Sequence, residues 1–511
     1  MTMIRARLPK DAAALALGAD AVAAALTNAA KKADVQLALT RTGSRGMFWL
    51  EPLLELETRF GWVSYGPMQA GDAASVLAAA RDGKPHPLAH GPVEEIAFFK
   101  QQTRLTFARC GVIDPDSLEA YTRAGGLAGL KRAIEIGPAA ILEEVTASGL
   151  RGRGGAGFPA GIKWRGAADA KADQKYIVCN ADEGDSGTYA DRMLMEGDPF
   201  LLIEGMAIAG IATGATYGYV YIRSEYPHAI ATMTAAVETA RASGLLGSKL
   251  MGSSHAFDLE IRSGAGAYVC GEETALLDSI EGKRGLVRAK PPLPVHKGLF
   301  GQPTVINNVL TLAAVPTILQ KGAKFYADFG MGKSRGTMPV QLAGDIKFGG
   351  LFETAFGTTL GELVDGIGGG THSGRAVRAV QVGGPLGAYF PRSLFDTPFD
   401  YEAFTEKGGL IGHGGIVVFN ASVDMAAQAR FAMEFCAAES CGKCTPCRIG
   451  STRGQELVDR ILGATDASAE IALLRELCDI MKSGSLCALG GFVPYPVLSA
   501  LDHFPQDFVR R

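Results

Sequence analysis

Three cysteines near the C-terminus stand at two-residue spacing in the segment Cys441-Gly-Lys-Cys444-Thr-Pro-Cys447, and Cys487 follows further along the chain. A short loop wound around a cubane supplies three thiolates from adjacent turns and needs one remote ligand. Zinc ribbons and fingers take pairs of ligands from two separate knuckles. The spacing therefore favours a [4Fe-4S] cluster held by Cys441, Cys444, Cys447 and Cys487, with a zinc site as the alternative.

A glycine-rich segment, Gly149–Pro159, forms a second chemical signal together with Lys163. Glycines let backbone amides approach a phosphate, and basic side chains add compensating positive charge. The segment follows a predicted helix at 134–148, whereas the usual dinucleotide fingerprint follows a strand. A phosphate-binding loop is one interpretation, and a flexible turn is the other.

Two further polar loops follow predicted strands. The strand at 176–179 runs into Asn180–Gly187, and the strand at 257–261 precedes Gly264–Glu273, with a helix beginning near Glu272. Open α/β sheets bind ligands outside the carboxyl ends of their strands. We therefore expect the three glycine-containing loops to line one crevice.

The charged residues of these loops predict a ligand with two different ends. Carboxylates repel phosphates, so Glu183, Asp185, Glu272 and Glu273 should face an uncharged or sugar end. By the same reasoning, Arg153, Lys163 and Lys290 should face phosphates. For Glu272 or Glu273 taken singly, a place at a helix N-terminus, favoured by the helix dipole, is a sufficient explanation.

Length and hydrophobic patterning indicate a multidomain α/β protein. A chain of 511 residues with 47% hydrophobic content should form three or four domains with ordinary cores. In the first 90 residues we predict a strand at 35–40, a hairpin of 55–58 and 61–65, helices at 12–30 and 70–81, and a linker at 83–92. Alternating strands and helices at 100–335 predict a parallel sheet covered on both faces. A strand-dense segment at 336–418 and a helical region follow.

Composition excludes several classes of partner. The 50 basic and 53 acidic residues nearly cancel, so no global field favours nucleic acid or an anionic membrane. The alanine-rich stretch after Arg5, Arg7 and Lys10 is interrupted by Asp11 and Asp20, which is atypical of a signal peptide. No segment has the ~20 apolar residues needed to span a bilayer. We expect a soluble cytoplasmic protein with no nucleic acid and no membrane insertion.

Nine cysteines, four of them expected as thiolate ligands, predict a reducing compartment. We expect Cys110, Cys436 and Cys478 to be buried core thiols.

Five motifs, in this order, resemble those of the NADH-binding flavoprotein subunit of respiratory complex I and its soluble relatives. They are Arg151–Pro159, Cys179–Arg192, Gly264–Glu273, Lys290–Asn308 and Cys441–Cys447. The resemblance covers about residues 95 to 511. It implies a Rossmann-like FMN- and NAD(H)-binding domain at 95–335, a β-grasp domain at 336–418 and a helical [4Fe-4S] domain at 419–511.

The resemblance also implies site residues. FMN contacts are expected from Gly152, Arg153, Gly154, Lys163, Asn180, Asp182, Glu183, Gly271, Glu272, Asn307 and Asn308. Contacts to NAD(H) are expected from Phe158, Asp185, Glu273 and Lys290. Glu273, beside the nicotinamide, and Glu183 are the carboxylates to which the resemblance gives a catalytic role.

The chain departs from its relatives at several of these positions. It has Asp185-Ser186 where many relatives have Glu-Pro, and Gly166 and Leu293 where they have aromatic residues. We therefore expect adenine stacking to depend mainly on Phe158.

Residues 1–90 resemble the thioredoxin-like [2Fe-2S] subunit that accompanies this flavoprotein. Ser44 and Gly46 stand at positions expected to ligate the cluster, which indicates a degenerate, cluster-free thioredoxin-like domain. A fused domain of this kind resembles the β subunit of soluble NAD-dependent molybdenum formate dehydrogenases. The diaphorase subunit of an NAD-reducing hydrogenase and the complex I subunit are the alternatives.

The resemblance implies a function in electron transfer. Hydride would pass between NAD and FMN, and single electrons between FMN and the [4Fe-4S] cluster. The expected partners are NAD(H), a thioredoxin-like [2Fe-2S] subunit and a catalytic subunit containing molybdenum and iron–sulfur clusters. A flavin-free iron–sulfur scaffold and a zinc-dependent binding module are alternatives from other classes.

Overall fold

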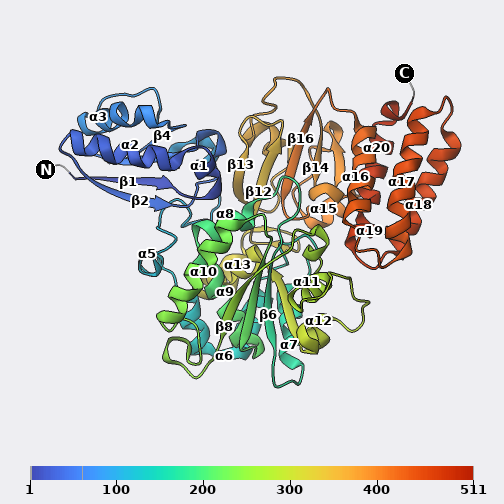
Figure 1. Ribbon diagram of the computed structural model, residues 1–511, viewed down its shortest axis with the longest axis horizontal. Coiled ribbons are helices and arrows are strands. Elements are labelled where there is room, and N and C mark those ends of the chain that lie inside the picture. Colours follow the sequence, from blue (N-terminus) through green and yellow to red (C-terminus); the bar gives the residue numbers. More distant parts are fainter. Residues whose placement is uncertain (1–2, 60, 510–511) are drawn as a thin grey trace.

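The computed structural model describes residues 3–59 and 61–509. The N-terminal part forms a five-stranded sheet in the order β2-β1-β3-β4-β5 (Figure 1). Its strands are β1 (Met3–Pro9), β2 (Gln36–Thr42), β3 (Leu54–Thr58), β4 (Gly61–Tyr65) and β5 (Ala89–Gly91), and its helices are α1 (Ala12–Ala16), α2 (Ala19–Lys32) and α3 (Ala73–Asp82). The parallel pair β1–β2 is connected through helices, as parallel strands require.

The predicted strands and hairpin of this part are confirmed, and two predictions differ from the structure. The single helix expected at 12–30 is divided because Gly18 adopts a left-handed conformation (φ 95°), which costs glycine little. The linker expected at 83–92 is wrong in part, because β5 lies inside it and pairs with β4. Strand β1 was not predicted.

A parallel sheet forms the centre of the molecule, with strand order β8-β7-β6-β9. The strands are β6 (Tyr176–Ala181), β7 (Tyr217–Ile222), β8 (Asp258–Ser263) and β9 (Thr304–Asn308). The helices around it are α5 (Leu118–Arg123), α6 (Ala128–Ala147), α7 (Ala160–Asp169), α8 (Ala190–Gly197), α9 (Pro199–Thr213), α10 (Pro227–Ala242), α11 (Glu273–Ile280), α12 (Pro294–Lys297), α13 (Val309–Lys321) and α14 (Ala323–Ala327). The short helix α4 (Ala97–Lys100) precedes them and packs elsewhere, because its Phe98 belongs to the core of a second sheet.

Both faces of this sheet are buried, as the continuous apolar strands predict. Alternate side chains such as Ile177 and Val220 pack in one core with α9 and α13. Their neighbours Val178 and Tyr221 belong to a second core, which includes α11 and the C-terminal helices. The sheet therefore has α9 and α13 on one face, and α11 and the cysteine-bearing C-terminal helices on the other.

A second, mixed sheet follows, in the order β13-β12-β16-β14-β15. Its strands are β12 (Thr337–Gly344), β13 (Gly350–Ala355), β14 (Val377–Val382), β15 (Ala388–Pro391) and β16 (Gly415–Asn420); α15 (Tyr401–Glu406) and a small hairpin of β10 (Gly330–Met331) and β11 (Ser334–Arg335) accompany it. Only the β12–β16 pair is parallel within this sheet as described. The glycine-rich, strand-dense pattern of 336–418 is confirmed.

The C-terminal part is helical, at the right of Figure 1. It comprises α16 (Met425–Glu439), α17 (Thr445–Gly463), α18 (Ser468–Gly484), α19 (Ala488–Phe492) and α20 (Pro494–His503). Of the helices within residues 3–59 and 61–509, none combines the length and apolar character that crossing a membrane requires.

The loop at 43–51 joins the N-terminal sheet to the rest of the chain. A Cβ added at Gly43 would lie 2.5 Å from Gly197 Cα, so the two backbones are in direct contact. Met47 forms a β-bridge with Gly350. Ser44 is buried and donates its hydroxyl to Glu51 at 2.5 Å, and the Gly46 amide donates to Ser44. The two positions expected to correspond to cluster ligands therefore belong to a hydrogen-bonded contact between parts of the fold.

Helix α9 should be sensitive to any increase in volume, because all its residues are buried. A methyl group at Gly205 would lie 2.1 Å from the carbonyl oxygen of Leu312 in α13. Gly205→Ala must separate two backbones, and overpacking of this kind costs about 1–3 kcal/mol of stability. We expect a lower Tm in thermal unfolding. The control, Gly366→Ala, adds a methyl with no atom within 4 Å and should leave Tm unchanged. Equal Tm values for the two variants would contradict this packing.

Candidate functional site

The site lies outside the carboxyl ends of β6 and β9. These strands pair in parallel with Asn180 opposite Asn308. From β6 the chain passes to β7 and β8 on one side of the sheet, whereas β9 lies on the other side. Such a switch point opens a crevice between the segments that follow the two strands, which are a loop after β6 and helix α13 after β9. The polar residues at the ends of both strands face this crevice.

Two cavities of about 610 Å³ and 270 Å³ fill the crevice. Both are lined by residues from all three predicted loops: Gly154, Ala156, Asn180, Gly271 and Glu272, together with Asn308 and Ala488. The expectation that the three loops share one crevice is confirmed. The combined space is in the range of protein sites for cofactor-sized ligands.

The glycine-rich loop is closed on itself. The Gly152 amide donates to the Phe158 carbonyl at 2.8 Å, and Arg151 and Pro159 form a β-bridge. A Cβ at Gly154 would lie 2.9 Å from Asn308 Cβ, so glycine is needed for the loop to approach β9. The loop thus presents backbone rather than side chains to the cavities, which suits a phosphate-bearing ligand.

Arg153 does not have the surroundings that its charge predicted. Its guanidinium is buried and donates to the carbonyls of Thr337 and Arg335 and to the Tyr326 hydroxyl. Its backbone amide donates to Thr311 at 2.8 Å. The side chain lines neither cavity. The expectation that Arg153 faces phosphates is wrong for its side chain, because buried carbonyls take its donors.

The other cations and carboxylates are paired instead of segregated. Lys290 Nζ lies 2.6 Å from Glu273 Oε1 and 3.0 Å from Glu272 Oε1, and Lys163 Nζ lies 3.5 Å from Glu273 Oε2. Burial alone would raise the pKa of Glu273, but the two ammonium groups hold it below its ordinary value. Because all four side chains line the 610 Å³ cavity, the predicted division into a phosphate end and an uncharged end is wrong here.

Glu272 has a second, structural role. As the N-cap of α11 it accepts hydrogen bonds from the amides of Thr274 and Ala275 at 2.8 and 2.9 Å. The explanation from helix N-termini therefore holds for Glu272. Its other oxygen binds Lys290, so the cap also orients that lysine.

The loop after β6 holds three carboxyl groups in different environments. Asn180 anchors the loop by donating to the Gly271 carbonyl at 2.8 Å. Burial raises the pKa of Asp182 to about 8. Burial also raises the pKa of Asp185, which accepts a hydrogen bond from the Tyr268 hydroxyl at 2.8 Å. Glu183 is buried and accepts the amides of Asp191 and Arg192 at 2.9 and 3.0 Å. This loop therefore lines the 270 Å³ cavity with acidic groups of unequal acidity.

The remaining predicted residues lie where the motifs suggest. Phe158 is half exposed beside Gly166 and Leu293 in the wall of the larger cavity. Asn307 also lines that cavity and accepts a hydrogen bond from the Trp164 indole at 2.8 Å.

The cysteines gather around the start of two helices. Cys444 is the N-cap of α17 and Cys487 is the N-cap of α19, while Cys447 lies in the first turn of α17 and Cys441 precedes it. A Cβ at Gly490 would lie 2.6 Å from Cys447 Cβ, which brings the first turn of α19 against α17. Helix N-termini favour thiolates, the form that ligates iron. The donor set and its arrangement fit an iron–sulfur cluster.

The prediction that Cys436 is a buried core thiol is confirmed, and the structure adds a contact that the sequence did not predict. The Sγ atom of Cys436 lies 3.8 Å from Cys447 Sγ. Hydrogen bonding with Cys436 lowers the pKa of Cys447 to about 7. Cys110 and Cys478 are buried core thiols, which confirms their prediction.

The two chemical centres share a wall. Cys487 and Ala488 line the 610 Å³ cavity together with Lys163, Glu273 and Asn308. A ligand in this cavity is therefore in contact with a residue expected to hold the cluster. Sequence reasoning did not predict this contact, because the residues concerned are far apart in the chain.

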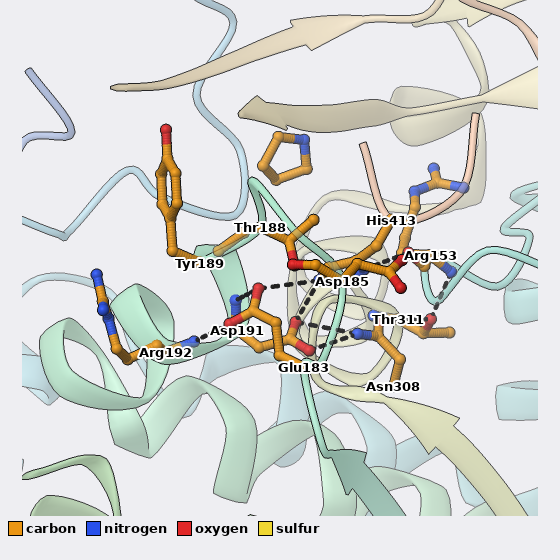
Figure 2. A network of polar contacts seen from close by, with 12 residues as sticks. Arg153, Glu183, Asp185, Thr188, Tyr189, Asp191, Arg192, Asn308, Thr311 and His413 are labelled. Atoms are coloured by element: carbon orange, nitrogen blue, oxygen red, sulfur yellow. Dashed lines mark hydrogen bonds and ion pairs between the residues drawn. The ribbon is translucent and has the colours of Figure 1, made fainter. Parts of the chain in front are cut away.

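Sequence reasoning also missed three polar residues of the site. Figure 2 shows Asp191 and His413 in one network with Glu183 and Asn308. Asp191 lies within the motif 179–192, so its position was a usable signal. Tyr268 likewise lies within the motif 264–273, whereas His413 carried no signal, since it reaches the cavity only through the tertiary fold.

Comparisons with known proteins agree with these two centres. Residues 145–317 match the family model described as the Nuo51 FMN-binding domain, and residues 427–511 match the NADH-ubiquinone oxidoreductase-F iron–sulfur binding region. The chain is 46% identical to "NADP-reducing hydrogenase subunit HndC" of Solidesulfovibrio fructosivorans over 80% of this chain and 83% of the relative. It is 36% identical to the mitochondrial NADH-ubiquinone oxidoreductase 51 kDa subunit of Neurospora crassa, over 86% and 90%.

A solved structure matches almost the whole chain. The crystal structure of an NAD⁺-reducing [NiFe]-hydrogenase in the H₂-reduced state has a chain similar to this one with a TM-score of 0.69. The sequence identity is 29%, and the match covers 99% of this chain and 84% of that chain. The likeness therefore extends over the N-terminal sheet as well as the site.

Removal of Cys487 should separate a ligand role from a core role. Cys487→Ala should lower the iron content and abolish the low-temperature EPR signal of the dithionite-reduced protein, because a remote ligand couples cluster binding to the packing of α17 and α19. Cys478→Ala is the matched control, a buried thiol in α18, and should keep its iron. An intact signal in the first variant or a lost signal in the second would overturn the assignment.

Proposed function

Since this chain belongs to the family of FMN- and iron–sulfur-binding flavoprotein subunits of NADH-quinone oxidoreductases and related hydrogenases, we propose that it transfers formate-derived electrons to NAD⁺ within a soluble complex. As a member of this family it is an NAD-dependent oxidoreductase module that binds FMN and a [4Fe-4S] cluster. The partner that supplies the electrons is the new part of the proposal.

The shared wall of the two centres is the observation that carries the electron-transfer role. Cys487 lines the same cavity as the glycine-rich loop and the Lys163–Glu273–Lys290 group. FMN bound there supplies the conversion between two-electron hydride chemistry and one-electron cluster chemistry. A flavin-free scaffold would not explain the presence of this cavity. A zinc-dependent binding module would not explain why the cavity contacts a cysteine of the predicted cluster.

We assign the binding of FMN to the backbone of Gly152, Arg153 and Gly154, to Lys163, and to the polar residues at the ends of β6, β9 and the 264–272 loop. These are Asn180, Asp182, Glu183, Gly271, Glu272, Asn307 and Asn308. Lys163 donates to the Ile306 carbonyl at 3.0 Å, which holds its ammonium group at the floor of the larger cavity.

We assign NAD(H) binding to Phe158, Asp185, Glu273 and Lys290. Phe158 offers an exposed ring for stacking, and Gly166 and Leu293 supply no second aromatic ring beside it. Lys290 and Lys163 fix the Glu273 carboxylate from two sides and keep it ionised. Glu273 can therefore accept hydrogen bonds from a nucleotide without changing its own protonation.

The catalytic residues of the proposal are Glu273 and Glu183, which act by position and charge and not as acids or bases. Glu183 accepts two backbone amides at the start of α8 and is held there by His413. Burial alone would raise the pKa of Glu183, but His413 and these amides hold it below its ordinary value. Its charge is thus a permanent feature of the cavity.

The choice of formate as electron source is supported by the N-terminal sheet. This part has no cysteine, and Ser44 and Glu51 fill the loop where ligands would stand. We propose a cytoplasmic complex with a thioredoxin-like [2Fe-2S] subunit and a molybdenum- and iron–sulfur-containing catalytic subunit. The alternative is the diaphorase of an NAD-reducing hydrogenase, which is favoured by the match of 99% of this chain to such an enzyme.

Metal analysis of the native complex decides between these partners. The chain, tagged and purified without oxygen from its own cells, should bring down a subunit containing molybdenum. Formate should then reduce NAD⁺ in the purified complex. Nickel in place of molybdenum, with NAD⁺ reduction by hydrogen, would identify the hydrogenase alternative and contradict the formate proposal.

Glu273→Gln should separate nucleotide binding from flavin binding. The substitution keeps the volume but removes the charge paired with Lys163 and Lys290, and a charge-assisted hydrogen bond of this kind changes a rate or affinity about tenfold or more. We expect kcat/KM for NADH oxidation with an artificial dye to fall about tenfold, while FMN absorbance per chain is unchanged. Glu260→Gln, at a partly exposed ion pair with Arg262 in β8, is the control. Loss of FMN from the Glu273 variant would show that the residue serves the flavin instead.

A further inference from the structure

His413 joins three loops of the flavin cavity from outside the flavin domain. It lies just before β16 of the mixed sheet, between Gly412 and Gly414, both with positive φ. A Cβ at Gly412 would lie 2.4 Å from Gly383 Cα, and one at Gly414 would lie 2.8 Å from the Pro339 carbonyl oxygen. Two glycines pressed against neighbouring backbone thus let His413 reach into the cavity.

Both ring nitrogens of His413 lie close to oxygen atoms that can accept a hydrogen bond from a protonated nitrogen. Nδ1 lies 2.8 Å from the Arg153 carbonyl oxygen, which can only accept a hydrogen bond. Nε2 lies 3.1 Å from Asp191 Oδ1 and 3.2 Å from Glu183 Oε1. Ionised carboxylates also only accept, so two of them within ion-pair distance of Nε2 favour a ring that carries hydrogen on both nitrogens. This geometry describes an imidazolium ion between two carboxylates (Figure 2).

The same residues organise the start of α8. The amides of Asp191 and Arg192 donate to Glu183, and the amide of Ala190 donates to Gln341 Oε1 at 2.8 Å. Gln341 in turn donates to the His413 carbonyl at 2.8 Å. The first-turn amides of a helix have no partners within the helix itself. Here they are satisfied by Glu183 and by Gln341, which also binds the backbone of His413.

Asn308 extends the network to β9. Its side-chain amide donates to both oxygens of Asp191, at 3.0 and 2.9 Å, and its own oxygen accepts from the Thr311 amide. The Arg153 amide donates to the Thr311 hydroxyl. The chain of contacts therefore closes on the glycine-rich loop, whose carbonyl His413 binds.

His413 differs in charge from the other ionisable residues that line the 270 Å³ cavity. The described residues that line it include five carboxyl groups, from Asp182, Glu183, Asp185, Asp191 and Glu272, and His413 is the only basic side chain among them. The Arg153 guanidinium points away, toward Tyr326 and Thr337. Without a cation, Glu183 and Asp191 would repel each other within the buried network.

We propose that His413 is a positioning residue for the flavin, which, as an imidazolium, holds the glycine-rich loop, the loop after β6 and helix α8 in the geometry that binds FMN. The inference rests on the flavin site of the proposed function and adds a residue from the mixed sheet to it. Burial would lower the pKa of His413, but Asp191 and Glu183 raise it well above the ordinary value. The charge should therefore persist at neutral pH.

A divalent metal ion is the competing occupant of this network. One ligand atom from each of Glu183, Asp191 and His413 lies within 4.8 Å of the others, and His413 Nε2 is aligned with neither carboxylate as a hydrogen-bond donor. Metal coordination would need Nε2 without its proton. Metal content therefore distinguishes an imidazolium from a coordinated imidazole.

The pH dependence has a definite sign. A histidine whose folded pKa is raised contributes its full stabilisation below the unfolded pKa and loses it as pH rises through the folded pKa. Because the imidazolium is proposed to hold the loops in the geometry that binds FMN, FMN affinity should also fall at alkaline pH. Asp182, with a pKa of about 8, titrates in the same cavity in any variant that keeps it. Subtracting the pH profile of FMN affinity of a His413 variant from that of wild type therefore gives the contribution of the histidine alone.

The test compares His413→Asn with wild type by the recovery of flavin fluorescence on dilution, between pH 6 and about 10. We expect the variant to bind FMN about tenfold more weakly at neutral pH, since a buried charged contact is lost. In both proteins the titration of Asp182 can change FMN affinity as pH rises. Only wild type should show the additional loss of FMN affinity that comes from deprotonation of His413. His372→Asn, at an exposed position of the same sheet region, should behave as wild type. Iron content should be equal in all three.

Further arms keep the inference testable if His413→Asn does not fold. Asp191→Asn should weaken FMN binding by a similar factor, and the wild-type pH profile and metal content need no variant. Equal FMN affinity and equal pH profiles would overturn the inference, as would one equivalent of a divalent metal other than iron in wild type. A wild type with the iron–sulfur spectrum but no flavin would overturn the flavin proposal itself, which is a distinguishable outcome.

Discussion

The parallel pairing of β6 with β9 is the constraint on which the site depends. It sets Asn180 opposite Asn308, so that the loop after β6 and the start of helix α13 leave the sheet at one point. The glycine-rich loop can approach this point only because Gly154 has no side chain facing Asn308. A shift of either strand by one residue would turn these side chains to the opposite face of the sheet. The strand register therefore decides which side chains face the cavity, and the chemistry of the cavity follows from that.

Buried charge is the second organising element. The crevice holds many carboxyl groups, and several are satisfied in different ways: Glu273 by two lysines, Glu272 by the start of α11, Glu183 by the start of α8 and by His413. An unpaired buried charge is costly, so these contacts hold the loops as well as the charges. An acidic lining would repel a phosphate ligand. Here the lysines, the helix N-termini and His413 offset the charge of the carboxylates locally. The amides of Gly152 and Arg153 already donate within the protein, so the backbone of the following glycines, such as Gly154, is left for the phosphate.

The contact between α19 and the cavity links the flavin site to the cluster. Because Gly490 lets α19 pack on Cys447, the N-cap Cys487 is brought to the cavity wall. The N-terminal sheet is joined differently, through the close contact of Gly43 with Gly197 and the β-bridge between Met47 and Gly350. The C-terminal helices therefore meet the cavity with a cysteine expected to hold the cluster, and the N-terminal sheet meets the rest of the fold through a packed loop.

Local patterns in the chain were sufficient for the elements and for the chemistry of the two centres. The cysteine spacing, the three glycine-containing loops and the apolar strands β6 and β7 each carry their signal within a few residues, so the cluster, the ligand crevice, the α/β fold and the C-terminal helices were predictable. FMN and NAD(H) were expected from the family resemblance of the five motifs. Residues that act through distant contacts were not predictable. Arg153 reads as a phosphate ligand until its guanidinium is found among buried carbonyls, and Cys436 reads as an ordinary core thiol until its sulfur is found beside Cys447. His413 carries no local signal, because its role arises from charges on two other elements. Pairing between remote charges depends on three-dimensional packing, which short-range sequence patterns do not encode.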